Sequence, residues 1–123
     1  VLAIRNRLVL EAVANALKRA GFFVEKSSSQ EPECILTLTN ALAATNLVMD
    51  VTRSGDGTFD MRMNTSREAR RRNPEIKIAL LCDNVSDESS AYKVKCAKED
   101  GSIDAFFYES VPSDYLADAI DAL

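Results

Sequence analysis

The stretch Leu47-Val48-Met49-Asp50-Val51, followed by a break at Asp56-Gly57, decides the fold predicted for this chain. A short apolar run closed by an acidic residue is typical of a parallel strand buried on both faces. In doubly wound sheets, ligands bind outside the carboxyl ends of such strands. Asp50 is therefore predicted to lie at the functional edge of a parallel sheet.

Length and composition limit the class of protein. The 123 residues, of which 46% are apolar, are enough for one sizeable core, so residues 1–123 are expected to form a single domain. The formal net charge of −4 disfavours binding to nucleic acid, whose phosphates attract clustered positive charge. No apolar stretch approaches the roughly 20 residues that cross a bilayer, and no signal-type start is present. We expect a cytoplasmic location and no membrane contact.

Histidine and cysteine usage excludes further chemistry. The chain has no histidine, which removes His-based triads, His general bases and His metal ligands. Its three cysteines, Cys34, Cys82 and Cys96, form no C-x-x-C pair, so neither a disulfide framework nor a zinc site is indicated. They are expected to be reduced thiols in the core.

Strand and helix signals alternate along the whole chain, which favours a parallel sheet covered by helices. Five strands are expected, at residues 1–4, 22–26, 47–50, 76–82 and 105–109. Five helices are expected: about 8–20, one from Pro32 with Ile35, Leu38 and Leu42 inward, about 59–72, one capped by Ser86 and ended by Gly101, and one opened by Ser113.

The segment after Pro32 has two interpretations. Residues 35–39 alternate in polarity and also fit a strand. A helix is preferred, because the parallel strand at Leu47 needs a crossover connection and such connections are normally helical.

The run Arg67-Glu68-Ala69-Arg70-Arg71-Arg72 is a basic end to the expected third helix. It is a candidate docking site for an acidic partner or a phosphate. Cations at a helix carboxyl terminus also complement the helix dipole, and Glu68 with Arg72 is an i, i+4 pair. A mostly solvated face is the favoured interpretation.

The order and spacing of these elements resemble the receiver domain of two-component response regulators, over essentially the whole chain. The segments that carry the resemblance are 47–51 with Asp56-Gly57, the stretch Asn73-Pro74-Glu75-Ile76-Lys77-Ile78-Ala79-Leu80-Leu81, and the tail from Gly101 through Ala105-Phe106-Phe107 to Leu123. The resemblance implies an α/β, flavodoxin-like (CheY-like) doubly wound fold, with a five-stranded parallel sheet in the order 2-1-3-4-5 and helices on both faces. It also implies a role in phosphorelay signal transduction, with a histidine kinase or another signalling protein as partner. It implies no enzymatic activity for the domain itself.

In receivers, the aspartate at the end of the third strand accepts a phosphoryl group, and Asp50 stands at that position. The transfer needs a Mg²⁺ ion held by acidic residues and a lysine that steadies the product. Here Arg5 stands in the place of the acidic pair, Cys82 in that of the switch serine or threonine, and Glu109 in that of the lysine. These departures predict weakened phosphotransfer.

A guanidinium offers a different solution at this edge. Arg5 could pair directly with Asp50 and occupy the place of the metal, so no cofactor is expected and Mg²⁺ binding is doubtful. Asp83, Asp56 and Asn84 are left as an unusual alternative cation site. Two functions stay open: a receiver that still accepts phosphate on Asp50, or a phosphorylation-independent pseudo-receiver that acts as an interaction or dimerisation module.

Some aromatic and apolar residues are candidates for partner contacts. Tyr92, Val94 and Cys96 match a region that receivers commonly use for partners or homodimers. Core packing is expected for Phe106 and Phe107, whereas Tyr108, at the strand end, is a candidate contact or switch aromatic.

Overall fold

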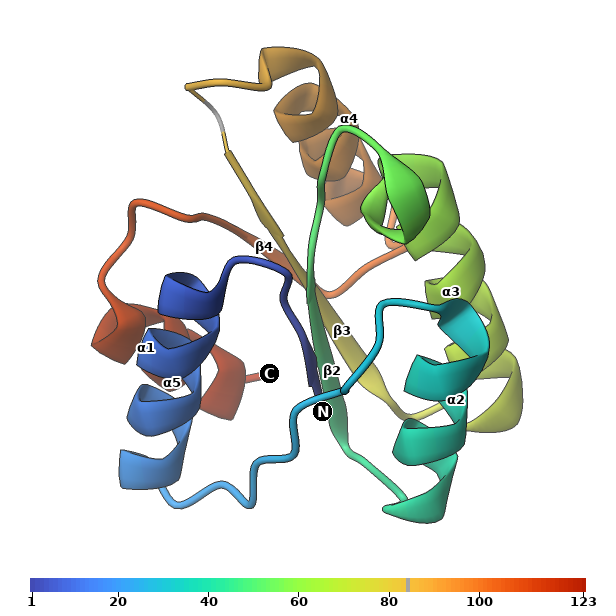
Figure 1. Ribbon diagram of the computed structural model, residues 1–123, viewed down its shortest axis with the longest axis vertical. Coiled ribbons are helices and arrows are strands. Elements are labelled where there is room, and N and C mark those ends of the chain that lie inside the picture. Colours follow the sequence, from blue (N-terminus) through green and yellow to red (C-terminus); the bar gives the residue numbers. More distant parts are fainter. Residues whose placement is uncertain (84) are drawn as a thin grey trace.

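Figure 1 shows a parallel sheet between two layers of helices in the computed structural model, which describes residues 1–83 and 85–123. The sheet has four strands in the order β1-β2-β3-β4, and all neighbouring strands pair in parallel. The strands are Leu2–Ala3 (β1), Asn46–Asp50 (β2), Lys77–Cys82 (β3) and Ala105–Tyr108 (β4). The helices are Arg7–Arg19 (α1), Pro32–Ala41 (α2), Phe59–Arg72 (α3), Glu88–Glu99 (α4) and Ser113–Asp121 (α5), with a short 3-10 helix at Gly55–Gly57 (η1).

The predicted five-stranded order 2-1-3-4-5 is wrong, because residues 22–26 do not form a strand. The segment lies beside β1 and makes a single parallel bridge between Leu2 and Lys26. The Leu2 amide donates to the Glu25 carbonyl at 2.9 Å, and the Ser27 amide donates to the Leu2 carbonyl at 2.8 Å. Because β1 is only two residues long, this segment cannot form more than a short pairing with it.

Helices cover both faces of the sheet. In Figure 1, α1 and α5 lie on one side and α2, α3 and α4 on the other. The side chains of β2 alternate between two apolar clusters: Leu47 and Met49 pack with α2, α3 and α4, whereas Val48 packs with α1 and α5. This two-sided burial explains why the central strands are nearly continuous apolar runs.

The five predicted helices are present, and α1 has a side-chain cap at its start and a glycine after its end. Asn6 accepts hydrogen bonds from the Leu8 and Val9 amides and begins α1, and Gly21, with a φ of 98°, follows its end. Residues 35–39 are helical, as preferred. Within the residues described, none of the helices is long and apolar enough to cross a bilayer.

Two local predictions are corrected. The α4 cap is Asp87, not Ser86, because the Asp87 carboxylate accepts from the Ser90 amide at 3.2 Å. Leu42 is 40% exposed and not inward: it is the cap residue after the last residue of α2, Ala41, and the buried residues of this helix are Ile35, Leu36 and Thr39.

The basic end of α3 is only partly a solvated face. Glu68 pairs with Arg72, as predicted, and also with Arg71. Arg70 instead donates to the carbonyls of residues 101 and 102 and forms an ion pair with Asp104. Arg70 therefore fixes the carboxyl end of α3 to the connection between α4 and β4.

Candidate functional site

The candidate site lies at the carboxyl end of β2, where Asp50 is only 1% exposed. One carboxylate oxygen, Oδ2, accepts the backbone amide of Arg5 at 2.9 Å. The other, Oδ1, lies 3.1 Å from Nη2 of Arg62. The ion pair is almost completely removed from water, since the two side chains are 0% (Arg62) and 2% (Asp50) exposed. Both oxygens of Asp50 are thus engaged within the protein.

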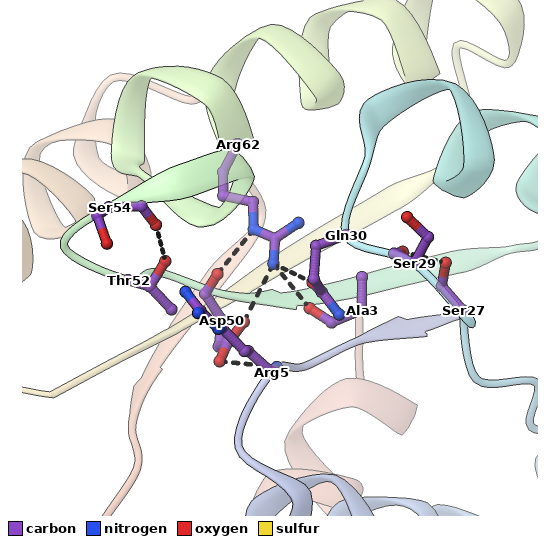
Figure 2. A network of polar contacts seen from close by, with 9 residues as sticks. All are labelled: Ala3, Arg5, Ser27, Ser29, Gln30, Asp50, Thr52, Ser54 and Arg62. Atoms are coloured by element: carbon purple, nitrogen blue, oxygen red, sulfur yellow. Dashed lines mark hydrogen bonds and ion pairs between the residues drawn. The ribbon is translucent and has the colours of Figure 1, made fainter.

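Arg62 is the centre of the network drawn in Figure 2, where it reaches from α3 across the end of the sheet. Its Nε donates to the Asp50 carbonyl at 2.8 Å. Its Nη2 also donates to the Ala3 carbonyl at 3.2 Å and to Oε1 of Gln30 at 2.5 Å. One side chain therefore joins α3, β1, β2 and the loop before α2. Among the described residues, its Nη1 has no hydrogen-bond partner.

The charges at this site balance within the protein. Burial lowers the pKa of Arg62, and the adjacent Asp50 carboxylate opposes that shift. A guanidinium has so high an ordinary pKa that it stays charged at neutral pH even so. Because a buried charge is tolerated only when it is paired and hydrogen-bonded, the two residues depend on each other.

The guanidinium predicted beside Asp50 is present, but it comes from Arg62 and not from Arg5. The Arg5 side chain is exposed, and the residue contributes only its backbone amide to Asp50. The physical reason is position: Arg5 follows β1 at the surface, whereas Arg62 projects inward from the second turn of α3.

A weak signal for Arg62 existed in the sequence. Helical spacing places it on one face with Ser66 and Ala69, and these are buried, at 1% and 2% exposure. An arginine aligned with small, inward-facing residues indicates a buried charge that needs a partner. No local pattern identifies that partner as Asp50, which lies 12 positions earlier on another element.

The Asp56-Gly57 turn lies in η1 and closes the loop over Arg62. The Thr52 amide donates to the Gly57 carbonyl at 2.7 Å. A Cβ at Gly57 would collide with the Thr52 side chain and would lie 3.4 Å from Nη2 of Arg62. Glycine is needed here because the loop approaches these side chains closely.

The two other predicted departures lie at the same edge. Cys82 is fully buried, and its thiol donates weakly to the Phe107 carbonyl at 3.7 Å, while burial raises its pKa to about 11. Glu109 is half-buried. Its pKa is raised by burial first and then by the negative charges of Asp50 and Asp83. The structure thus places a carboxylate near Asp50, where a cation would be needed to hold a phosphoryl group.

The residues around Asp50 do not fit a Mg²⁺ ion. Arg62 and the Arg5 amide already satisfy the carboxylate, and a guanidinium 3.1 Å away repels a divalent cation. Within residues 1–83 and 85–123, no three His, Cys, Asp or Glu side chains come together as a metal site would require. Of the alternative cation site, Asn84 lies outside the described residues.

The remaining residues that were predicted to contact a partner differ in how far their side chains are exposed. Val94 is completely buried, so it belongs to the core, because its position on α4 faces the sheet. Tyr92 is 69% exposed, and Cys96 is half-buried. Tyr108 is half-buried and packs edge-on against Phe106, with ring centroids 5.8 Å apart.

The three cysteine thiols also differ in exposure. Cys82 is the core thiol that was predicted, whereas Cys34 is exposed. Cys34 lies in the first turn of α2, on the side that faces solvent. All three cysteines are free thiols.

Comparison with known proteins is informative at the level of structure. No protein-family model matches the chain, and no curated protein does. Solved structures do match the chain, and three of them cover 98% of it. A CheY-like protein (tadZ) from Pseudomonas aeruginosa PAO1 has a TM-score of 0.72 at 16% identity, over 96% of its own length. The chain has the fold of a response-regulator receiver domain.

The other two structures agree with this fold. The signal receiver domain of the putative response regulator NarL from Mycobacterium tuberculosis has a TM-score of 0.71 at 14% identity, over 92% of its length. A response regulator protein from Burkholderia multivorans has a TM-score of 0.66 at 18% identity, over 90% of its length. The receiver fold is thus present with a site in which Arg62 holds Asp50.

Proposed function

We propose that this chain is a phosphorylation-independent receiver-like domain, a protein-interaction module in signalling whose Asp50 takes no phosphoryl group. The observation that carries the proposal is the buried ion pair between Asp50 and Arg62, with Nη2 3.1 Å from Oδ1. The proposed partner is another signalling protein, and the domain itself is not an enzyme.

Access to the nucleophile supports this function. Attack on a phosphoryl donor requires a free carboxylate oxygen in line with the reacting phosphorus. Both oxygens of Asp50 are hydrogen-bonded, and the residue is 1% exposed. Freeing Oδ1 would leave the guanidinium of Arg62 buried without its counter-ion, at a cost of several kcal/mol.

Electrostatics around Asp50 support the same conclusion. Phosphoryl transfer depends on cations that neutralise the developing charge. Glu109, which follows β4 at the same edge of the sheet, adds negative charge instead; its pKa is raised by burial first and then by Asp50 and Asp83. The cation that is present, Arg62, already balances the charge of Asp50, so a phosphoryl group would add charge that the site does not neutralise.

The test is intact-mass analysis after incubation with acetyl phosphate and Mg²⁺. Wild type and Asp50→Asn are treated in parallel with an ordinary receiver domain that confirms the labelling conditions. We expect no gain in mass for the wild type while the ordinary receiver is labelled. One added phosphoryl group on the wild type, lost in Asp50→Asn, would overturn the proposal and establish a working phosphoacceptor.

A further inference from the structure

The edge of the sheet at β1 is formed by an irregular segment that lies outside the Asp50 site. Residues 22–26 lie beside β1 and are the outermost segment on that side of the sheet. Among the described residues, their one pairing with a strand of the sheet is the bridge between Leu2 and Lys26. An edge of this kind presents unpaired backbone groups that can accept another strand.

The direction of these groups follows from the bridge. The Glu25 carbonyl and the Ser27 amide face β1, because both bond to Leu2. The bridge turns the amide and carbonyl of Lys26 away from β1. Backbone groups alternate in direction along an extended chain, so we infer that those of Val24 face the same way. No backbone hydrogen bond within the described residues uses either amide.

The side chains leave this edge unprotected. Phe23 is 80% exposed, although a large aromatic residue gains much from burial. Edges are commonly protected by lysine, but the ammonium of Lys26 turns towards α1, where it lies 2.6 Å from Glu11. Phe22 and Val24, on the other face of the segment, pack against the cluster beneath α1 and α5.

We propose that this edge pairs with the same edge of a second copy of the chain, as an antiparallel two-fold interface centred on Val24. In this register the two Val24 residues exchange both outward-facing hydrogen bonds. Each Glu25 lies opposite a Phe23, and the two Phe23 rings are diagonal neighbours within contact distance.

Charge selects this register over its neighbours. Centring the pair on Glu25 would place two carboxylates directly opposite each other. Centring it on Lys26 would do the same with two ammonium groups. Like charges directly opposite destabilise a strand pair, whereas the register at Val24 has none. Because the paired segment is short, the interface is smaller than that of a stable dimer, and association is expected only at high protein concentration.

The experiment is sedimentation equilibrium of the full chain from about 10 μM to about 1 mM, a range that covers dissociation constants between micromolar and millimolar. We expect the average mass of the wild type to rise towards that of a dimer. Val24→Pro removes an outward amide that is not used within the fold, and Phe23→Lys places a charge on the edge; both variants should stay monomeric. Leu8→Lys is the matched control, since Leu8 is 84% exposed but lies on α1. It should behave like the wild type.

The outcomes separate clearly. A wild type that is monomeric throughout, or a Phe23→Lys variant that dimerises like the wild type, would overturn the inference. Loss of association in Leu8→Lys as well would show a general solubility effect and would also overturn it. Circular dichroism of each variant shows that it is folded. Phosphorylation of Asp50 would refute the proposed function without affecting this inference.

Discussion

Arg62 is the residue on which the candidate site depends. It is 0% exposed and contacts Asp50, Ala3 and Gln30 with a single guanidinium. Breaking a buried ion pair by removing one partner costs about 3–5 kcal/mol, because the other charge is left unpaired. Removing both charges costs much less, since neither is then left alone.

A double-mutant cycle tests this dependence. We expect Arg62→Met and Asp50→Asn each to lower the free energy of unfolding by about 3–5 kcal/mol, and the double variant to lose clearly less than the sum. Urea denaturation gives the values. Arg19→Met is the control, since the Arg19–Asp114 pair is exposed and should contribute little. Strict additivity of the two single changes would show that Asp50 and Arg62 do not stabilise each other.

Glu109 gives the stability a defined pH dependence. Its pKa is raised in the folded protein, first by burial and then by Asp50 and Asp83. A carboxyl group with a raised folded pKa binds its proton more tightly when folded, so its ionised form opposes folding. That penalty is present above the raised pKa and disappears as the pH falls below the ordinary value of 4.5.

Glu109→Gln should therefore stabilise the protein at pH 7.5, with a gain that shrinks towards pH 4 as the wild-type carboxyl group takes up its proton. Urea midpoints at the two pH values measure the difference. Glu99→Gln on the exposed side of α4 controls for the simple loss of one carboxylate. A gain that stays constant or grows on acidification would contradict the assigned direction of the shift.

At the scale of elements, α2 ends under strain. Ala43 follows its carboxyl-terminal cap with a φ of 49°, the left-handed region that favours glycine. The Ala43 amide bonds to the Asn40 carbonyl, and the Ala44 amide bonds to the Thr39 carbonyl, so the tight turn is fixed by backbone hydrogen bonds. A residue with a Cβ pays about 1 kcal/mol for this conformation.

Ala43→Gly should raise the free energy of unfolding by about 0.5–1 kcal/mol, because glycine removes the steric conflict at a helix end. Thermal unfolding followed by circular dichroism measures the gain. Ala41→Gly, two residues earlier and at the last residue of α2, should have the opposite effect, since glycine has a lower helix propensity than alanine. Equal destabilisation by both changes would show that the Ala43 conformation carries no strain.

For the whole molecule, local stability should follow the topology. β2 and β3 pair over five residues at the centre of the sheet and are covered by helices on both faces, as Figure 1 shows. The segment 22–26 pairs with the sheet through a single bridge at its edge. Regions with few buried contacts open more often than the core does.

Amide hydrogen exchange tests this order. At low protein concentration, we expect the Met49 and Leu80 amides to exchange slowest and those of Val24 and Lys26 to exchange fast. At high concentration, the latter two should slow if the edge pairs with a second copy. Protection of Val24 equal to that of Leu80 in the dilute protein would contradict the topology described here.

Much of the architecture could be predicted from local patterns. The apolar runs at 47–50 and 76–82 indicated buried parallel strands, and helical spacing indicated helices such as α1 and α3, although the cap predicted for α4 was wrong. Periodicity and capping act over a few residues, so they can be read in sequence order. The prediction of a strand at residues 22–26 was wrong because strand pairing depends on the neighbouring strand, and β1 is too short to pair with all of it. That residues 1–123 form one domain stays a prediction.

The sequence by itself determined the receiver-like order of elements, the place of Asp50 at the end of a central strand, and the departures at Arg5, Cys82 and Glu109. Only the tertiary structure decided which cation meets Asp50 and whether the outer segment joins the sheet. The reason is physical: the identity of a strand end is set by local burial, whereas a buried ion pair requires two side chains from separate elements to meet. Arg62 and Asp50 lie on α3 and β2, and packing brings them together.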